Sequence, residues 1–200
     1  MSPSGRWVYT LFTLATRPNH PTREAIIEAS AEVFSRQGVA KTNVQDLLLA
    51  AKVSRRTFYK YFANKDEVLS ALYESMTGLL VDVISGSSSS LSLDHVMLGI
   101  DGYLDFHLEN TALLQVLIEQ AMRSDSLLHA RRTWFRKQLV TALQRTAASV
   151  SGKNVEALLL YGLLSMIEGM SLHLLEQGCK PKDIERAKQT IHRLAHHLLS

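Results

Sequence analysis

The sequence predicts an all-α protein of about nine helices, with a small three-helix domain at the N-terminus followed by a larger helical domain. Three observations carry this prediction. Apolar residues recur every three or four positions through most of the 200 residues, which is the spacing of amphipathic helices. Strand-like stretches are scarce, and residues typical of helix caps and breaks separate the helical stretches. A hydrophobic fraction of 46% is ample for a core.

The first strong helix is predicted between Pro21 and Gly38. Proline is favoured at the first helical position, and glycine is favoured just past the last turn. Apolar residues fall on one face of this helix: Ala25, Ile26, Ala29, Val33 and Phe34. We interpret residues 1–19 as a flexible or partly helical arm, with a misassigned start codon as the alternative.

Two short helices joined by a tight turn are predicted next. Thr42 followed three residues later by Gln45 is a capping-box pattern, which predicts that a helix begins at Asn43. Ser54 is a good N-cap for a second helix that continues to about Phe62. Two helices joined in this way form a helix-turn-helix, whose second helix enters the major groove of DNA.

The second of these helices has two different faces. Phe58 and Phe62 lie four residues apart and are expected to point inward with Val53. The opposite face carries mostly basic and polar residues: Arg55, Arg56, Tyr59, Lys60 and Ala63. Between residues 36 and 65, seven basic residues stand against one acid, a net charge of +6 in a chain of only +3. This concentration suits DNA phosphates, whereas the alternative is a solvated basic face on an ordinary helical protein.

Three residues at the start of the second helix are candidates for reading bases. Arg55 and Arg56 can each pair with guanine through two hydrogen bonds. Thr57 offers a hydroxyl and a methyl group to bases or phosphate. The sequence therefore predicts a double-stranded DNA operator as the partner of this segment.

The segment from about Thr22 to Leu72 resembles the DNA-binding domain of tetracycline-repressor-type (TetR family) transcriptional regulators. The run VSRRTFYKYFANKDEVL is highly specific to that family. The residues that match the pattern of the family are Ala29, Phe34, Gly38, Thr42, Val44, Leu47, Ala51, Val53, Ser54, Thr57, Tyr59, Phe62, Lys65, Glu67 and Leu69. The resemblance implies that Thr42, Tyr59 and Lys65 grip phosphates, while the start of the recognition helix reads bases.

One residue departs from the pattern of that family. The family usually has glycine just before the Val-Ser pair, where this chain has Lys52. If the turn keeps a left-handed conformation there, a residue other than glycine costs roughly 1 kcal/mol. The alternative is that Lys52 adopts a slightly different turn, in which it would add a phosphate contact. The predicted DNA-binding residues are therefore Thr42, Lys52, Arg55, Arg56, Thr57, Tyr59, Lys60 and Lys65.

The chain is predicted to divide into an arm (1–19), a helix-turn-helix domain (20–65) and a ligand-binding and dimerisation domain (66–200). The run from Ser85 to Ser90 is linker-like in composition. The stretch from Ala157 to Leu175 is apolar nearly all round, so it must be buried on every side. We expect the last two helices to form a homodimer interface, the alternative being that both complete a monomeric core.

Polar and aromatic residues on the apolar helices are candidates for an effector site. Ligand cavities are mostly apolar with a few directing polar groups, although each such residue is more often part of a core. The candidates are Tyr103, His107, Trp134, Tyr161, Glu168 and His173. A small, largely apolar effector is the expected partner of this site.

Other classes of protein find little support in the sequence. No phosphate-binding glycine loop, nucleophile elbow or His-Glu-x-x-His pair is present, so neither catalytic residues nor a cofactor are predicted. No metal site is predicted, because the histidines of the last helix lack a carboxylate or thiol nearby in sequence. The single cysteine, Cys179, fits a reducing cytoplasm. No apolar run is expected to reach the ~20 residues that span a bilayer.

Three functions remain after these exclusions. The favoured hypothesis is a cytoplasmic repressor that a ligand releases from a palindromic operator. The second is a DNA-binding regulator without a small-molecule ligand. The third is a helical enzyme or ligand carrier with an incidental basic face.

Overall fold

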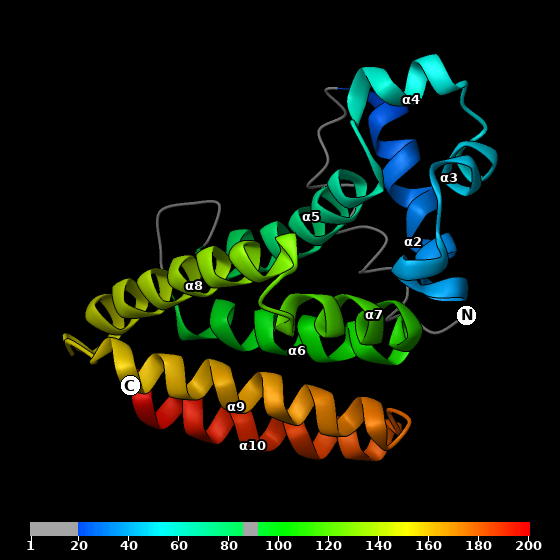
Figure 1. Ribbon diagram of the computed structural model, residues 1–200. Coiled ribbons are helices and arrows are strands. Elements are labelled where there is room, and N and C mark those ends of the chain that lie inside the picture. The colour runs from blue at the N-terminus through cyan, green and yellow to red at the C-terminus, as the bar shows by residue number, and fades with distance from the viewer. Residues whose placement is uncertain (1–19, 86–91) are drawn as a thin grey trace. The chain divides into compact units, whose positions relative to one another are not determined.

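The computed structural model describes residues 20–85 and 92–200, without the side chains of residues 79–85 and 106–109. This part of the chain is all-α, which confirms the predicted class (Figure 1). Its nine helices are α2 (Pro21–Lys41), α3 (Val44–Ala51), α4 (Arg55–Tyr61), α5 (Lys65–Ser85), α6 (Leu93–Glu109), α7 (Thr111–Met122), α8 (Leu127–Ser151), α9 (Ala157–Glu176) and α10 (Pro181–Leu199). The predicted arm and most of the predicted linker lie outside the described residues.

The described residues form two compact units. The N-terminal unit contains residues 20–77 and 112–131, and the C-terminal unit contains residues 78–85, 92–111 and 132–200. Helices α5 and α8 each contribute residues to both units. The boundary between residues 65 and 66 stays a prediction.

Helix α2 begins where its sequence indicates and is interrupted at the glycine that was predicted to end it. Pro21 occupies the first turn, where its missing N–H costs no hydrogen bond. Gly38 has φ 74° and ψ 164°, so it interrupts the regular helix three residues before Lys41. The side chains of Ile26, Ile27 and Phe34 are fully buried and anchor α2 in the core of the N-terminal unit.

The predicted capping box of α3 is wrong by one residue. The N-cap is Asn43, whose side chain accepts from Asp46 N at 3.1 Å, while the Asp46 carboxylate accepts from Asn43 N at 2.9 Å. Gln37 also donates to that carboxylate, at 2.9 Å. Thr42 cannot cap α3, because its buried hydroxyl donates to Gly38 O at 2.7 Å. Gln45 is therefore free of any capping role.

The core of the N-terminal unit is larger than a three-helix domain. Phe34, Leu47 and Phe58 from the first three helices lie in one cluster with residues of α5. Leu113 and Leu117 of α7 belong to the same cluster. Arg131 at the start of α8 also joins this unit, through an ion pair with Glu74 at 2.6 Å. Helices well beyond the helix-turn-helix therefore help to support it.

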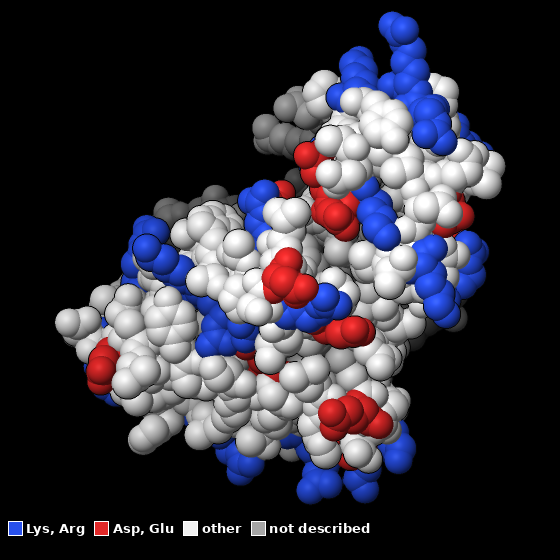
Figure 2. All heavy atoms as spheres, in the orientation of Figure 1, with Lys and Arg blue, Asp and Glu red and all other residues white. Residues whose placement is uncertain are grey.

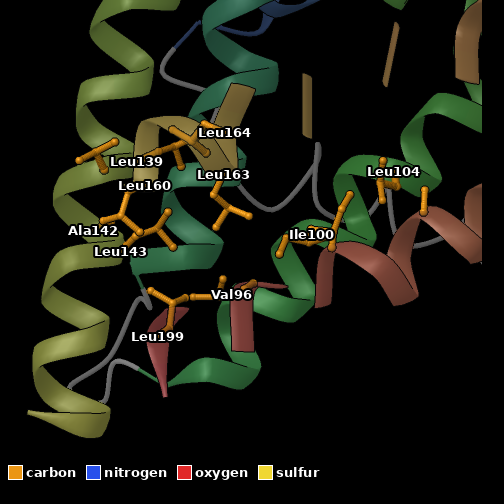
Figure 3. Packing of buried hydrophobic residues seen from close by; sticks show 14 of the residues in the cluster. Val96, Ile100, Leu104, Leu139, Ala142, Leu143, Leu160, Leu163, Leu164 and Leu199 are labelled. Carbon is orange, nitrogen blue, oxygen red and sulfur yellow. The ribbon is translucent and has the colours of Figure 1, made fainter. Parts of the chain in front are cut away.

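The C-terminal unit is built around a second apolar cluster drawn from α6, α8, α9 and α10 (Figure 3). Helix α10 contributes its predicted stripe, with Ile184, Ala187 and Ile191 buried along one side. Helices α9 and α10 lie side by side, connected by a short turn (Figure 1). The turn contains Cys179, which is buried and has a left-handed φ of 49°.

Helix α9 is apolar on its exposed side as well as its buried side. Leu160, Leu163 and Leu164 are buried in the C-terminal cluster, whereas Leu158 and Leu159 are 71% and 51% exposed. The expectation that no apolar run approaches 20 residues is wrong for α9, which is long and apolar enough to cross a membrane by length and composition. A core helix of a soluble protein passes the same test, so this is weak evidence for a membrane segment.

Candidate nucleic-acid interface

Helix α4 is held in place by a cap at its start and by aromatic rings on its inner face. The Ser54 hydroxyl accepts from Thr57 N at 3.1 Å, as the sequence predicts. Phe58 is fully buried and Phe62 is 3% exposed, with ring centroids 5.9 Å apart. The guanidinium of Arg23 on α2 covers the Phe62 ring at 5.3 Å. The inner face of α4 is therefore fixed against α2 and the core.

The outer face of α4 presents the predicted basic residues to solvent. Arg55, Arg56, Tyr59 and Lys60 are all exposed, while Thr57 is half-buried. Figure 2 shows Lys and Arg side chains on the surface at the top of the view, where Figure 1 places α4. An open hollow of about 540 Å³ on this surface is lined by Arg56, Thr57, Tyr59, Lys60 and Tyr61. A protruding cationic helix beside such a hollow is suited to an anionic, grooved partner such as duplex DNA.

The remaining predicted phosphate contacts have other partners in the structure. Lys65 donates through Nζ to Val39 O and to Thr42 O, both at 2.7 Å. Thr42 itself is 1% exposed, and its hydroxyl is used by Gly38. The ammonium of Lys65 therefore links the start of α5 to the end of α2, with one N–H left for a phosphate. The roles of Thr42 and Lys65 in binding DNA stay predictions.

Lys52 adopts the left-handed backbone conformation for which the family usually has glycine at this position. Its φ is 54° and its ψ is 40°, and the turn is closed by Val53 N donating to Leu48 O at 3.1 Å. Glycine adopts this conformation without the steric cost that a Cβ brings. The side chain of Lys52 is exposed on the N-terminal unit. The residue therefore combines backbone strain with a solvent-facing positive charge.

We expect Lys52→Gly to raise the free energy of unfolding by about 1 kcal/mol, because it removes the left-handed strain. Chemical denaturation measures this change. Lys52→Ala is the matched control, since alanine removes the charge but keeps the Cβ. If Lys52 contacts a phosphate, both variants lower the salt slope of DNA binding by about one unit. Equal stability of the two variants would contradict the strain at this turn.

The predicted effector residues are only partly brought together in the C-terminal unit. Tyr103 and Tyr161 pack against its apolar cluster, and Tyr103 also bonds to Ser171. Glu168 pairs with Arg132 in the same unit. Trp134 is 61% exposed and His173 is also exposed, so neither lies in the core. The side chain of His107 lies outside the described residues.

A charged cluster that the sequence did not reveal joins α8 to α9. The Glu168 carboxylate accepts from Arg132 Nε at 3.0 Å and Nη2 at 2.5 Å, and also from Arg136. Arg136 further donates to Ser165 Oγ at 2.8 Å. Only the four-residue spacing of the two arginines on α8 could have suggested this cluster.

Tyr103 adds a partly buried polar contact to the same unit. Its phenol oxygen accepts a hydrogen bond from Ser171 Oγ at 3.2 Å. Burial raises the pKa of Tyr103, so the phenol stays neutral at ordinary pH. Within residues 20–85 and 92–200 no three His, Cys, Asp or Glu residues are grouped so as to hold a metal ion.

The described fold and its exposed basic helix define a helix-turn-helix protein. Residues 26–72 match the family model described as "Bacterial regulatory proteins, tetR family". The matched residues include the whole helix-turn-helix, and the match supports a regulator of the tetracycline-repressor type.

The comparison with curated proteins finds relatives of the same kind. The chain is 27% identical over 110 residues to the HTH-type transcriptional repressor SCO4008 of Streptomyces coelicolor. The match covers 54% of each chain, so this chain spans about half the length of that relative.

Solved structures resemble the chain over most of its length. The fatty acid degradation regulator FadR from Bacillus halodurans superposes with a TM-score of 0.73 at 19% identity, covering 88% of this chain and 95% of FadR. SmeT in complex with triclosan gives a TM-score of 0.72 at 16% identity, covering 88% and 90% of the two chains. At these identities the likeness shows the fold.

Proposed function

We propose that the protein is a cytoplasmic, DNA-binding transcriptional regulator that binds a palindromic operator as a homodimer and is released by a small-molecule effector. The observation that carries the proposal is the outer face of α4, where Arg55, Arg56, Tyr59 and Lys60 are exposed while the inner face is locked by Phe58. An exposed recognition helix on a rigid support is the arrangement that enters the major groove. The match of residues 26–72 to the tetR family model supports the same function.

The two arginines of α4 provide the test of base reading. Arg55→Ala or Arg56→Ala is expected to cost about 1–3 kcal/mol of operator binding and to relax the preference at particular base pairs. Fluorescence anisotropy with the operator and with random duplexes of equal length measures both effects. If each variant loses equal affinity for specific and random DNA, neither arginine reads bases.

The exposed side of α9 supports the proposed homodimer. Leu158 and Leu159 are exposed near its start, and Gly162, Ser165 and Gly169 continue along an exposed face. Apolar and small side chains at such spacing let a second helix approach closely. Two copies of α9 and α10 would form a four-helix interface, as the last two helices were predicted to do.

Dimerisation matters because a symmetric reader needs two recognition helices. Half-sites for such a reader lie about 34 Å apart or at a multiple of that distance. Leu158→Glu places a charge on the exposed apolar side of α9 without disturbing the buried cluster. We expect this variant to be monomeric in analytical ultracentrifugation and to lose the palindromic operator. If the variant remained a dimer, the dimer interface would have to lie on a different surface.

The effector part of the proposal rests on the C-terminal unit and on one relative. SmeT, a structural neighbour, was solved as a complex with triclosan. In the C-terminal unit, half-buried Tyr103 and buried Ser171 supply polar groups beside an apolar cluster, as ligand sites require. A largely apolar effector would bind there and favour an arrangement of the dimer in which the spacing of the recognition helices is wrong.

The switch has a quantitative requirement. An effector shifts two states only by its differential affinity for them, so a change from about 1:99 to 99:1 needs a 10⁴-fold difference. A thermal-shift screen identifies compounds that bind, and anisotropy with the operator then tests release. A compound that binds the C-terminal unit without changing operator affinity would favour a regulator that responds to a different signal.

A further inference from the structure

Two residues on different helices share a hydrogen bond at the outer edge of the helix-turn-helix. Arg55 Nη2 on α4 donates to Gln45 Oε1 on α3 at 3.3 Å. Both side chains are exposed on the N-terminal unit. Gln45 has no capping role, because Asn43 and Asp46 cap α3. The side-chain hydrogen bond of Gln45 therefore leads to a predicted base-reading arginine.

The pairing fixes which way the Gln45 amide points. A guanidinium has five N–H donors and no acceptor, so only the amide oxygen can face Arg55. The NH₂ group of Gln45 must then point away from the arginine. Arg55 also keeps four of its five N–H donors for another partner. The pair presents mainly hydrogen-bond donors to whatever lies outside it.

The backbone around Gln45 is held firmly within α3. Its neighbour Asp46 accepts hydrogen bonds from Asn43 N and from Gln37 Nε2, both at 2.9 Å. Leu47 and Leu48, which follow, are buried in the core. Because the backbone at Gln45 is fixed, its side chain loses less conformational entropy when it pairs with Arg55. The pair can therefore restrict the long Arg55 side chain before DNA binds.

We propose that Gln45 is a positioning residue that orients Arg55 for an acceptor-rich base edge, and that guanine is the base this pair selects. Guanine is the base whose major-groove edge offers two acceptors, O6 and N7, without an adjacent donor. A freely rotating arginine would reach phosphates and neighbouring bases as well. The inference rests on the proposed function, because it requires that α4 lies in the major groove.

Two substitutions of Gln45 distinguish the effect of its hydrogen bond to Arg55 from the effect of its side-chain size. Gln45→Met keeps the length and the helical propensity of the side chain but removes the amide oxygen. Gln45→Glu keeps an oxygen and adds a charge, which binds the guanidinium more strongly and withdraws Arg55 from the base. Gln45 is exposed and does not contribute to the core, so both variants are expected to unfold at the same temperature as the unaltered protein.

The experiment measures the preference for guanine over the other bases at each position of the operator, for the full-length chain. DNA selected from a random pool by the unaltered protein supplies the operator. Arg55→Ala identifies the base pair that Arg55 reads, where we expect a loss of preference of roughly tenfold or more. Gln45→Met is expected to lower the preference about three- to tenfold at that same base pair and to leave the other positions unchanged.

The double variant Gln45→Met/Arg55→Ala decides between the alternatives. If Gln45 acts through Arg55, the double variant has the preference of Arg55→Ala alone. Additive losses, or a loss at a different base pair, would show that Gln45 reads a base by itself and would overturn the inference. An unchanged preference in Gln45→Met would overturn it while leaving the proposed function intact. If the unaltered protein selects no consensus, both proposals fall.

Discussion

Phe58→Ala is expected to lower the free energy of unfolding by about 3–5 kcal/mol, because it leaves a cavity under the recognition helix. The Phe58 side chain is fully buried and packs against Phe62, in a cluster that includes residues of α2, α5 and α7. Chemical denaturation gives the loss directly. Operator binding should fall with it, since α4 has no other fully buried side chain.

Tyr59→Ala is the matched control for that substitution. Tyr59 is the next residue on α4, is also aromatic and is 48% exposed. It touches the edge of the Phe58 ring, with centroids 5.5 Å apart, so its removal should cost about 1 kcal/mol or less. Its predicted role as a phosphate contact would appear as weaker binding to all sequences. Equal loss of stability in the two variants would contradict the two-faced helix.

Lys65→Met is expected to lower the free energy of unfolding by about 2–3 kcal/mol. The substitution removes two hydrogen bonds from a charged donor and leaves the carbonyl groups of Val39 and Thr42 without it. Because those carbonyls close the end of α2, the loss should be visible before any DNA is added. Denaturation of the variant measures it.

Lys60→Met is the control that separates this structural role from a phosphate contact. Lys60 is exposed on α4 and interacts with the Tyr61 ring at 5.6 Å. Its substitution should leave stability nearly unchanged and lower the salt slope of DNA binding by about one unit. If Lys65→Met instead had normal stability and only a lower salt slope, Lys65 would be a phosphate contact alone.

The arrangement of the helices near the N-terminus could be predicted because local signals agree there. Pro21, Gly38 and Ser54 each act as a start, a break or a cap in the structure, as their types indicate. The cap of α3 was misjudged because Thr42 and Asn43 are both good N-cap residues. Burial of Thr42 at the end of α2 decided between them, and burial is not a local property of the sequence.

Other features depend on contacts between distant residues. Helical spacing shows that Leu113 and Leu117 of α7 are apolar, but it does not show that they join the core of the N-terminal unit. The same limit hid the pairing of Arg132 and Arg136 with Glu168, more than thirty residues away. Partner choice across such separations is set by the packing of whole helices.

The residues of the candidate DNA surface show the same division. The exposure of Arg55, Arg56 and Lys60 follows from their position opposite Phe58 on a short helix, so periodicity was enough. The contact of Lys65 with two carbonyls of another helix could not be read from periodicity. Neither could the Gln45–Arg55 pair, which joins residues ten positions apart.

Selection of bound duplexes from a random DNA pool tests the central claim most directly. The account predicts a palindromic consensus with two half-sites whose centres lie about 34 Å apart or at a multiple of that distance. It also predicts that Arg55→Ala changes the preferred base within each half-site. Retention of duplexes with no shared sequence, or of none at all, would contradict a sequence-specific dimeric regulator.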